Sequence, residues 1–409
     1  MRRPALLAGL DIGTHQITAA VGRLTATQAL EVIALQEGPT RGVEHGVIVD
    51  LADAVEAVAR LVRQVEEEAG ARITTVAVTI HGPSIRSHNA QATVTLPDSS
   101  SEISRWDVDR VLAGCRAAAS AYDRQVLHEF VQRFLVDEQD GVRDPLGLYG
   151  GRLGAALHVV TIQTAILQSW RKILNHAGVE VQAFVLPGVA TSHAVLSDLD
   201  RDLGVIVVDI GGSHTDIICW VDGAIRETLA VPWGGDQFTA SLAERFELPL
   251  VAAEQLKLQC NSIEPHAASD DLLRISVGQG RRAVQRAEVG ALLAEQAKRL
   301  LTDVRGRLDS SPYFHEASAG LVVTGGTALM EGVLELAETV CNLPVRLGTL
   351  HEVVCAPRVT VGPAAPTAIG LLAYQLSVKR PIRVVTPAPS PHTLGRFVQR
   401  AKILLEEYF

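Results

Sequence analysis

The chain has 409 residues, of which 20% are charged and 47% hydrophobic, and its 46 acidic and 37 basic side chains leave a net charge of -9 at pH 7. This length is typical of two or three domains, and the composition excludes a chain that is disordered throughout. An acidic chain without a basic cluster interleaved with aromatic residues also argues against nucleic acid as a partner. The five cysteines have no metal-like or redox-like spacing, which is typical of small buried residues in a reducing cytosol.

The first elements are expected to form a meander. Strands are predicted at 6–10, 18–24 and 30–36, then a helix over 53–69 with apolar residues at helical spacing, and a strand at 75–80 that stops at His-Gly-Pro. The apolar run near the N-terminus is interrupted by Asp11 with no cleavage site after it, so we expect no signal peptide. No apolar run reaches about 18 residues, so no membrane-spanning helix is predicted.

The segment from 84 to 157 differs in character from its surroundings. It contains a predicted short strand at 90–95, a helix at 107–120, a strand at 125–134 and the loop DEQDGVRDPLGLYGG. Its density of glycine and proline predicts an exposed subdomain inserted into the first half. Alternating elements then resume, with strands at 158–162 and 179–184 and helices at 166–177 and 187–196.

The second half is expected to begin with another meander, with strands at 205–209, 215–220 and 224–231. The elements predicted after it are helices at 235–246, 251–259 and 283–308, a strand at 321–324, and helices at 329–340 and 364–376. Segment 379–392 contains four prolines and reads as a linker. The repeated meander predicts a chain built from two related halves.

Two turns, in LDIGTHQ and VVDIGGSHTD, place an aspartate at the end of an apolar strand, before glycines and hydroxyl side chains. Backbone N–H groups of such a turn can approach a phosphate closely, because glycine has no Cβ. A carboxylate beside phosphates needs a cation, and Asp11 and Asp209 together suit a hydrated Mg²⁺ held through water. A third glycine pair, in VVTGGTALMEG, opens a helix and suits a nucleoside. The three turns predict a nucleotide site between the halves.

The order of meanders and glycine turns resembles the actin/Hsp70/sugar-kinase fold, an α/β, ribonuclease H-like duplicated fold. Within that superfamily the chain resembles the FtsA family of bacterial cell-division proteins, along nearly its whole length. The resemblance is carried by RGVEHGVIVDL (41–51), GLYGGRLGAALHVVT (147–161), VLPGVATSHAVL (185–196), DLGVIVVDIGG (202–212), AEQLKLQ (253–259) and VVTGGTALMEGV (322–333). FtsA proteins carry an inserted subdomain, 1C, where actin has 1B, which matches the insertion expected here.

The resemblance implies how the chain is divided and which residues bind the cofactors. The division is subdomain 1A (1–83 and 158–196), inserted subdomain 1C (84–157), 2A (197–232 and 306–377), 2B (233–305), a linker (378–392) and an amphipathic membrane-targeting helix (393–409). The implied cofactors are ATP and Mg²⁺, with Asp11 and Asp209 holding the metal through water. The implied nucleotide site consists of a first loop with Asp11, Gly13, Thr14, His15 and Gln16, a second loop with Asp209, Gly211, Gly212, Ser213, His214 and Thr215, an adenosine side with Gly325, Gly326 and Thr327, and Glu254 and Lys257 over the ribose and base.

Two residues depart from the family pattern. Gln16 stands where related proteins often have a lysine, which removes a positive charge from the phosphate site, and Ser213 stands where a third glycine is common. No residue is placed to orient a hydrolytic water, so we predict ATP binding without catalytic residues and a turnover below roughly 1 s⁻¹. His15 and His214 are expected to face solvent rather than to act as ligands, and Asp216 to cap its own turn.

The C-terminal sequence LGRFVQRAKILLEEYF has one continuous apolar face at helical spacing. The face consists of Leu394, Phe397, Val398, Ala401, Leu404, Leu405 and Tyr408, and the basic residues beside it are Arg396, Arg400 and Lys402. A helix docked on its own domain and an interfacial membrane helix are both open, and the proline-rich linker favours the second. We expect weak binding to membrane lipids by one copy and tight binding by a filament of many copies.

The resemblance implies a protein that binds ATP, self-associates into filaments and tethers FtsZ filaments to the cytoplasmic face of the inner membrane at the division septum. The FtsZ C-terminal tail would dock on helices near 235–305, and subdomain 1C would contact filament neighbours and later division proteins. Two alternatives stay open. One is a pilus-assembly-type actin-like adaptor, against which the C-terminal segment counts. The other is a sugar-kinase-like ATPase, for which no catalytic carboxylate can be placed.

Overall fold

A computed structural model describes residues 6–97, 102–119, 121–264, 271–278, 280–362 and 364–379. The chain divides into two compact units, Met1–Tyr374 and Gln375–Phe409, and the architecture below is that of the first. The first two residues of the predicted linker, 378 and 379, belong to helix α10, and the rest of the linker and the amphipathic helix lie outside the described residues. None of the helices in the described ranges is long and apolar enough to cross a bilayer.

The first half is built on a 6-stranded sheet with the order β11-β6-β1-β2-β3-β19. Its strands are β1 (Leu6–Ile12), β2 (Gln16–Leu24), β3 (Leu30–Pro39), β6 (Thr75–Thr79), β11 (Glu180–Val185) and β19 (Val353–Cys355). The meander β1-β2-β3 is antiparallel, whereas β6 runs parallel to β1 and β11 parallel to β6. Helix α1 (Leu51–Ala69), which Asp50 caps, packs its apolar stripe on β2 and β3, and α3 (Thr164–His176) lies beside it. The short hairpin β4 (Val43–Glu44)–β5 (Val47–Ile48) precedes α1.

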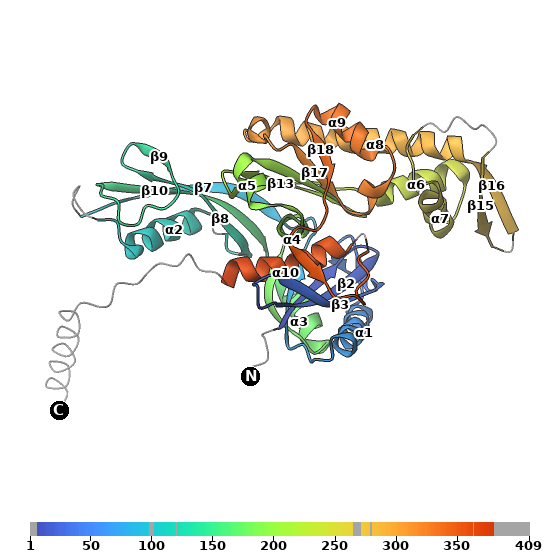
Figure 1. The fold of residues 1–409 in the computed structure, drawn as a ribbon, viewed down its shortest axis with the longest axis horizontal. Coiled ribbons are helices and arrows are strands. Elements are labelled where there is room, and N and C mark those ends of the chain that lie inside the picture. The colour runs from blue at the N-terminus through green and yellow to red at the C-terminus, as the bar shows by residue number, and fades with distance from the viewer. Residues whose placement is uncertain are drawn as a thin grey trace. The chain divides into compact units, whose positions relative to one another are not determined.

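The second half repeats this plan on a 5-stranded sheet with the order β14-β13-β12-β17-β18. Its strands are β12 (Val205–Ile210), β13 (Thr215–Val221), β14 (Ala224–Val231), β17 (Leu321–Thr324) and β18 (Val345–Leu347). An antiparallel meander is again followed by strands parallel to its first member. The order matches β3-β2-β1-β6-β11 strand for strand, which confirms the predicted duplicated fold. In Figure 1, the labels β2 and β3 mark the first sheet, and β13, β17 and β18 mark the second.

The insertion contributes a separate 4-stranded sheet with the order β7-β10-β8-β9, covered by α2 (Arg105–Ala119). Its strands are β7 (Arg86–Thr95), β8 (Arg124–Val136), β9 (Gln139–Val142) and β10 (Arg152–Gln163). The strand predicted at 158–162 is present, but it is the end of the longer β10, which pairs with β7 and β8 rather than with the first sheet. The burial of β10 without a break from Leu153 to Ile162 explains why this strand continues through the glycine-rich stretch.

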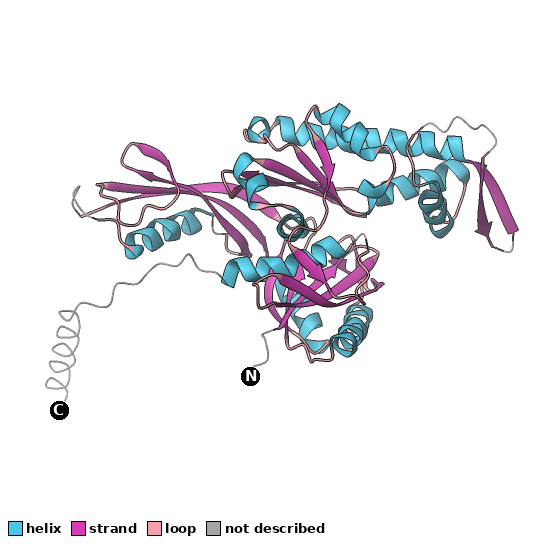
Figure 2. Cartoon of the chain, in the orientation of Figure 1, coloured by secondary structure: helices cyan, strands magenta, loops and turns pink. Residues whose placement is uncertain are grey.

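Helices and one hairpin extend the second half (Figure 2). They are α5 (Asp198–Leu203), α6 (Gly235–Phe246), α7 (Leu250–Cys260), the hairpin β15 (Leu272–Val277)–β16 (Gly280–Gln285), α8 (Arg286–Asp309) and α9 (Val333–Cys341). Sequence analysis missed the hairpin, and the helix predicted from 283 begins at Arg286 because 280–285 form β16. The helix predicted from 329 begins at Val333, after a short 3₁₀ turn at Gly326–Leu329. Another 3₁₀ turn, Phe314–Glu316, follows α8.

Two helices, one packed on each sheet, cross where the halves meet. Helix α4 (Pro187–Val195) follows the first sheet but packs on β12 and β13. Helix α10 (Ala365–Lys379) follows β19 of the first sheet and packs on that sheet, where a Cβ atom at Gly9 of β1 would lie 2.7 Å from the Ala368 carbonyl oxygen. The helices cross so closely that a Cβ at Gly370 would lie 1.9 Å from the Ala190 carbonyl oxygen. This crossing holds the ends of β1 and β12 side by side.

Candidate functional site

A cleft of about 500 Å³ lies where the ends of β1, β12 and β17 meet the first turns of α4, α6 and α10. The predicted nucleotide-site residues that line it are Asp11, Gly13, Thr14, His15, Gln16, Asp209, Gly211, Gly212, His214, Glu254, Lys257, Gly325, Gly326 and Thr327. Segments far apart in the sequence are therefore brought together as expected. Ser213 and Thr215 belong to the same loop but do not line the cleft.

The two aspartates occupy matching positions, and each accepts a hydrogen bond from a threonine of a neighbouring element. Thr79 Oγ1 donates to Asp11 Oδ1 at 2.7 Å, and Thr191 Oγ1 donates to Asp209 Oδ2 at 2.7 Å. The pKa of Asp11 is raised to about 7 and that of Asp209 to about 6, chiefly by burial and also by neighbouring carboxylates, against the effect of the threonines and of His214. A pair of buried carboxylates that ionise at this cost is suited to a cation between them, so these residues fit a Mg²⁺ bound through water. Within the described ranges, no group of three or more His, Cys, Asp or Glu is arranged to hold a metal directly.

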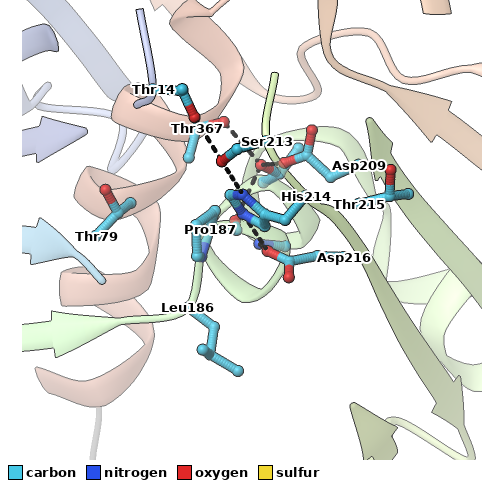
Figure 3. Close-up of polar contacts among 12 residues, drawn as sticks. Thr14, Thr79, Leu186, Pro187, Asp209, Ser213, His214, Thr215, Asp216 and Thr367 are labelled. Atoms are coloured by element: carbon cyan, nitrogen blue, oxygen red, sulfur yellow. Dashed lines mark hydrogen bonds and ion pairs between the residues drawn. The ribbon is translucent and has the colours of Figure 1, made fainter. Parts of the chain in front are cut away.

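The two glycine turns after these aspartates are closed in the same way. Gly13 N–H donates to the Gln16 carbonyl at 3.0 Å, and Gly211 N–H donates to the His214 carbonyl at 3.0 Å. A Cβ atom at Gly13 would lie 2.9 Å from the Gln16 oxygen, and one at Gly211 would lie 3.0 Å from the His214 oxygen. Glycine is required by this close approach, and it leaves the backbone open to an anion. The turns also touch each other, since Thr14 Oγ1 lies 2.7 Å from Ser213 Oγ (Figure 3).

The N-terminus of α6 is joined to the second turn by backbone hydrogen bonds. Gly235 N–H donates to Gly211 and Asp236 N–H donates to Gly212, both at 2.9 Å. Beneath the turn, the Thr215 hydroxyl donates to the Trp233 carbonyl at 3.0 Å, so this predicted phosphate-loop hydroxyl points away from the cleft. The site therefore keeps the loop's glycines at the cleft and uses Thr215 to hold the loop in place.

His214 and Asp216 differ from the expectations drawn from the sequence. The His214 side chain is 20% exposed rather than facing solvent, it stacks on His81 with ring centroids 4.1 Å apart, and its Nε2 lies 3.7 Å from Asp216 Oδ2 (Figure 3). Burial alone would lower the pKa of His214, but the Asp216 carboxylate raises it. Asp216 does not cap its own turn, because it accepts the Gly188 N–H at the first turn of α4, 3.0 Å away. His15 is 68% exposed, which confirms the solvent-facing expectation for this residue.

Glu254 and Lys257 of α7 lie at one side of the cleft and form an ion pair of 2.7 Å. Lys257 Nζ also lies 2.9 Å from Thr239 Oγ1 and 3.2 Å from the Gly235 carbonyl oxygen. At another side of the cleft, Gly325 follows the end of β17 with φ 91°, and a Cβ at this residue would lie 2.3 Å from the Ile210 carbonyl oxygen. The third glycine turn therefore packs directly against the strand end that carries Asp209.

Several site residues were not found from the sequence. They are Thr79, His81, Pro187, Thr191, Asp236, Asn261, Met330 and Thr367. A signal existed for Asp236. It follows the glycine pair Gly234-Gly235, as Ser213 and Thr327 follow the other two glycine pairs. Thr79 becomes predictable only from the β1–β6 register, which pairs Leu10 with Val78 and so brings Thr79 beside Asp11.

The matching sheets, the crossed helices and the cleft lined by two Asp-Gly turns define an actin-like protein. Solved structures support this class. The PilM-PilN type IV pilus biogenesis complex matches with a TM-score of 0.62 at 16% identity, covering 91% of this chain and 99% of that one. MreB5 of Spiroplasma citri bound to ADP matches with a TM-score of 0.54 at 12% identity, covering 92% and 97%.

Sequence comparison gives the particular family. The family model described as "SHS2 domain inserted in FTSA" matches residues 82–161, and "Cell division protein FtsA" matches 206–370. Cell division protein FtsA of Pseudomonas aeruginosa is 37% identical, with 91% of this chain and 89% of that protein aligned. The Neisseria meningitidis protein of the same name is 33% identical (89% and 88%), and that of Escherichia coli K12 is 30% identical (90% and 90%). The chain belongs to the FtsA family, as its sequence motifs suggested.

Proposed function

We propose that this chain binds ATP with Mg²⁺ in the cleft, polymerises, and tethers FtsZ filaments to the cytoplasmic face of the cell membrane at the division septum. In this role it would help to recruit later division proteins. The observation that carries the nucleotide part is the pair of matching glycine turns, each placed directly after a buried aspartate and both opening on one cleft. Membership of a cell-division family supports the rest.

Each part of the cleft has a proposed role. The turns at Gly13–Gln16 and Gly211–His214 would bind the phosphates through backbone N–H groups. Gly325, Gly326 and Thr327 would flank the adenosine, with Glu254 and Lys257 on the ribose and base side. Mg²⁺, held through water by Asp11 and Asp209, would neutralise charge on the phosphates.

We expect hydrolysis to be slow, so that the protein is at most a slow ATPase. The side-chain amide of Gln16 carries no charge and its Nε2 lies 3.4 Å from Thr18 Oγ1, so position 16 adds no cation. A turnover above roughly 1 s⁻¹ contradicts this expectation. The test of binding is equilibrium dialysis of the full chain against ATP and ADP, with Mg²⁺ and with EDTA. Absence of ATP binding in Mg²⁺ refutes the nucleotide part.

The remaining parts of the proposal concern surfaces and partners. We propose the subdomain division predicted from the sequence, except that the insertion extends to the end of β10 at Gln163. The FtsZ C-terminal tail would bind the helices of 233–305, and filament neighbours and later division proteins would bind 84–157. The C-terminal segment 393–409 would bind membrane lipids. Titration of the full chain with a labelled FtsZ C-terminal peptide tests the tether, and failure to bind removes it from the proposal.

The two alternatives receive less support. The pilus complex shares the fold at 16% identity, whereas FtsA relatives at 30% identity or more align with about nine-tenths of the chain, which favours cell division. A sugar-kinase-like ATPase needs a free catalytic carboxylate, but each of the four identified at the cleft has another partner or role. Asp11 and Asp209 are the proposed metal ligands, Glu254 pairs with Lys257, and Asp236 pairs with His15. A phosphorylation assay over small sugars tests that alternative directly.

A further inference from the structure

The proposed phosphate site is poor in free positive charge. Of the described residues that line the cleft, Lys257 is the only lysine or arginine, and its ammonium group is already bound by Glu254 at 2.7 Å and Thr239 at 2.9 Å. His81 is neutral, because burial lowers its pKa to about 3. His214 also lines the cleft, but a charge on its ring is paired with Asp216, whose Oδ2 lies 3.7 Å from His214 Nε2. A polyphosphate entering this cleft therefore needs a positive charge from another side chain.

His15 is placed to provide this charge. Its Nε2 lies 2.5 Å from Asp236 Oδ1, a contact between the first glycine turn and the first turn of α6 on the opposite half. The pair lies directly over the second turn, since a Cβ at Gly212 would be 3.0 Å from Asp236 Oδ1 and 3.2 Å from His15 Cδ2. An anion bound at the Gly211-Gly212 turn must therefore lie next to both side chains.

The two partners differ in freedom to move. Asp236 is 24% exposed, and its own backbone N–H is bonded to the Gly212 carbonyl at 2.9 Å. His15 is 68% exposed and stands in a turn, so its ring can leave the carboxylate with little cost in packing. A phosphate beside this pair is attracted by an imidazolium and repelled by the carboxylate, which favours exchange of the histidine from one anion to the other.

We propose that His15 is the phosphate-binding cation of the cleft, and that Asp236 holds it across the cleft until a nucleotide phosphate replaces the carboxylate. The inference rests on the proposed binding of ATP and adds the residue that supplies the positive charge absent from Gln16. It also makes nucleotide entry compete with an ion pair that joins the two halves.

The pH dependence of binding follows from the groups that face His15. These are Asp236 from α6 and Glu254 and Lys257 from α7. The hydrogen bond from Asp236 raises the pKa of His15 above its usual value, Glu254 adds to this, and burial and Lys257 oppose it. Polyphosphate carries more negative charge than one carboxylate, so the complex holds the proton more tightly than the free protein does. ATP affinity therefore decreases as pH rises through the pKa of His15 in the free protein.

The experiment is titration of the full chain with fluorescent ATP in saturating Mg²⁺ at about pH 6 and about pH 8.5, on either side of the histidine range. His15→Ala should weaken binding about tenfold at the lower pH and remove the pH dependence. Asp236→Asn should bind ATP several-fold more tightly, and its ATP affinity should begin to decrease at a lower pH than that of the wild type. His15→Ala combined with Gln16→Lys should restore affinity without its pH dependence. The exposed His176→Ala, far from the cleft, is the matched control.

The possible outcomes distinguish the role of His15 from the proposed binding of ATP. If His15→Ala and the wild type bind ATP equally and with the same pH dependence, His15 is not the phosphate cation, although ATP binding stands. If the wild type binds no ATP at either pH, the proposed function fails and the inference fails with it. Circular dichroism of each variant shows whether the fold is intact, which the exposure of His15 leads us to expect.

Discussion

At the scale of single residues, threonines fix the direction of both candidate metal ligands. Ile12 N–H donates to Thr79 Oγ1 at 2.9 Å, so the Thr79 hydroxyl proton points to Asp11. Thr191 donates to Asp209, and its oxygen lies 3.0 Å from the Thr367 hydroxyl of α10. Each hydroxyl satisfies one carboxylate oxygen and leaves the other for a metal-bound water. Strand pairing and helix crossing thus determine how the carboxylates face the cleft.

Asp209→Asn should separate cofactor binding from stability. The amide keeps a hydrogen-bond acceptor for Thr191 but loses the charge, so we expect Mg-ATP affinity to fall by about tenfold or more. The metal-free protein should not lose stability, because ionising the buried carboxylate is costly. Calorimetric titration and thermal melts in EDTA measure the two effects. Asp198→Asn, at a 96% exposed side chain, is the control, and equal Mg-ATP affinity in both variants contradicts the proposed role.

The cleft residues that could be predicted from the sequence are those that belong to a local sequence pattern. Asp11 and Asp209 could be predicted because a carboxylate after a buried strand and before glycine is unusual. His214 could not be placed, because its burial depends on His81, which lies at the end of a different strand. Thr191 and Thr367 were missed for the same reason, since their contacts arise only when α4 and α10 cross.

At the scale of elements, the crossing of α4 and α10 depends on a residue without a side chain. Gly370→Ala would place a Cβ 1.9 Å from the Ala190 carbonyl oxygen, so one helix must move away. We expect the free energy of unfolding to fall by about 3 kcal/mol. Gly306→Ala in α8, where no atom lies within 4 Å of the new Cβ, should instead be neutral or stabilising by up to about 1 kcal/mol. Urea unfolding of both variants measures this, and equal effects would show that the helices adjust freely.

The inserted sheet meets the second half at a buried histidine of β10. His158 Nδ1 lies 2.7 Å from Asn89 Oδ1, and its Nε2 accepts the Thr228 N–H of β14 at 3.1 Å. Gln132 and Arg226 exchange further hydrogen bonds with each other's backbone carbonyls. Burial lowers the pKa of His158 to about 4, from a usual value of 6.5. The junction thus requires the neutral imidazole.

This requirement predicts a loss of stability in acid. The unfolded chain takes up the proton first, so the contribution of His158 is complete above pH 6.5 and is lost as pH falls from 6.5 towards about 4. Replacement by glutamine removes the titrating group, so it should reduce the total acid destabilisation by up to about 3 kcal/mol. Denaturant unfolding at a series of pH values, with exposed His176→Gln as control, measures the slopes. Identical slopes for all proteins would refute the assignment.

The elements that sequence reasoning missed are those whose pattern is ambiguous without their partners. In β15, the buried Leu273 and Ile275 alternate with the exposed Leu272 and Arg274, which indicates a strand, but β16 exposes most of its residues and gives no such signal. The predicted helix start at 283 fell inside β16, because no glycine or proline separates the end of this strand from α8. The meanders were predicted correctly because their strands are apolar and their turns, except the one at 25–28, contain glycine.

At the scale of the whole molecule, the proposed function joins assembly to membrane attachment. Between 378 and 402 the sequence has six basic residues and no acidic ones, and each adds on the order of 1 kcal/mol near an anionic leaflet. One amphipathic segment of this length binds reversibly, whereas a filament presents many segments at high effective concentration. Conditions that favour polymerisation should therefore favour membrane binding.

Liposome co-sedimentation of the full chain and of a version ending at Thr386, each with and without Mg-ATP, tests this coupling. We expect only the full chain to pellet, and ATP to increase the pelleted fraction if nucleotide promotes polymerisation. Leu404→Glu places a charge on the apolar face and should abolish pelleting, while Glu406→Gln off that face should not. If neither length pellets under any condition, the segment docks on protein rather than lipid. A different result is also possible, in which ATP drives polymerisation but the full chain pellets equally with and without it. Attachment then does not depend on avidity, and a single segment must bind lipid more tightly than its seven apolar residues suggest.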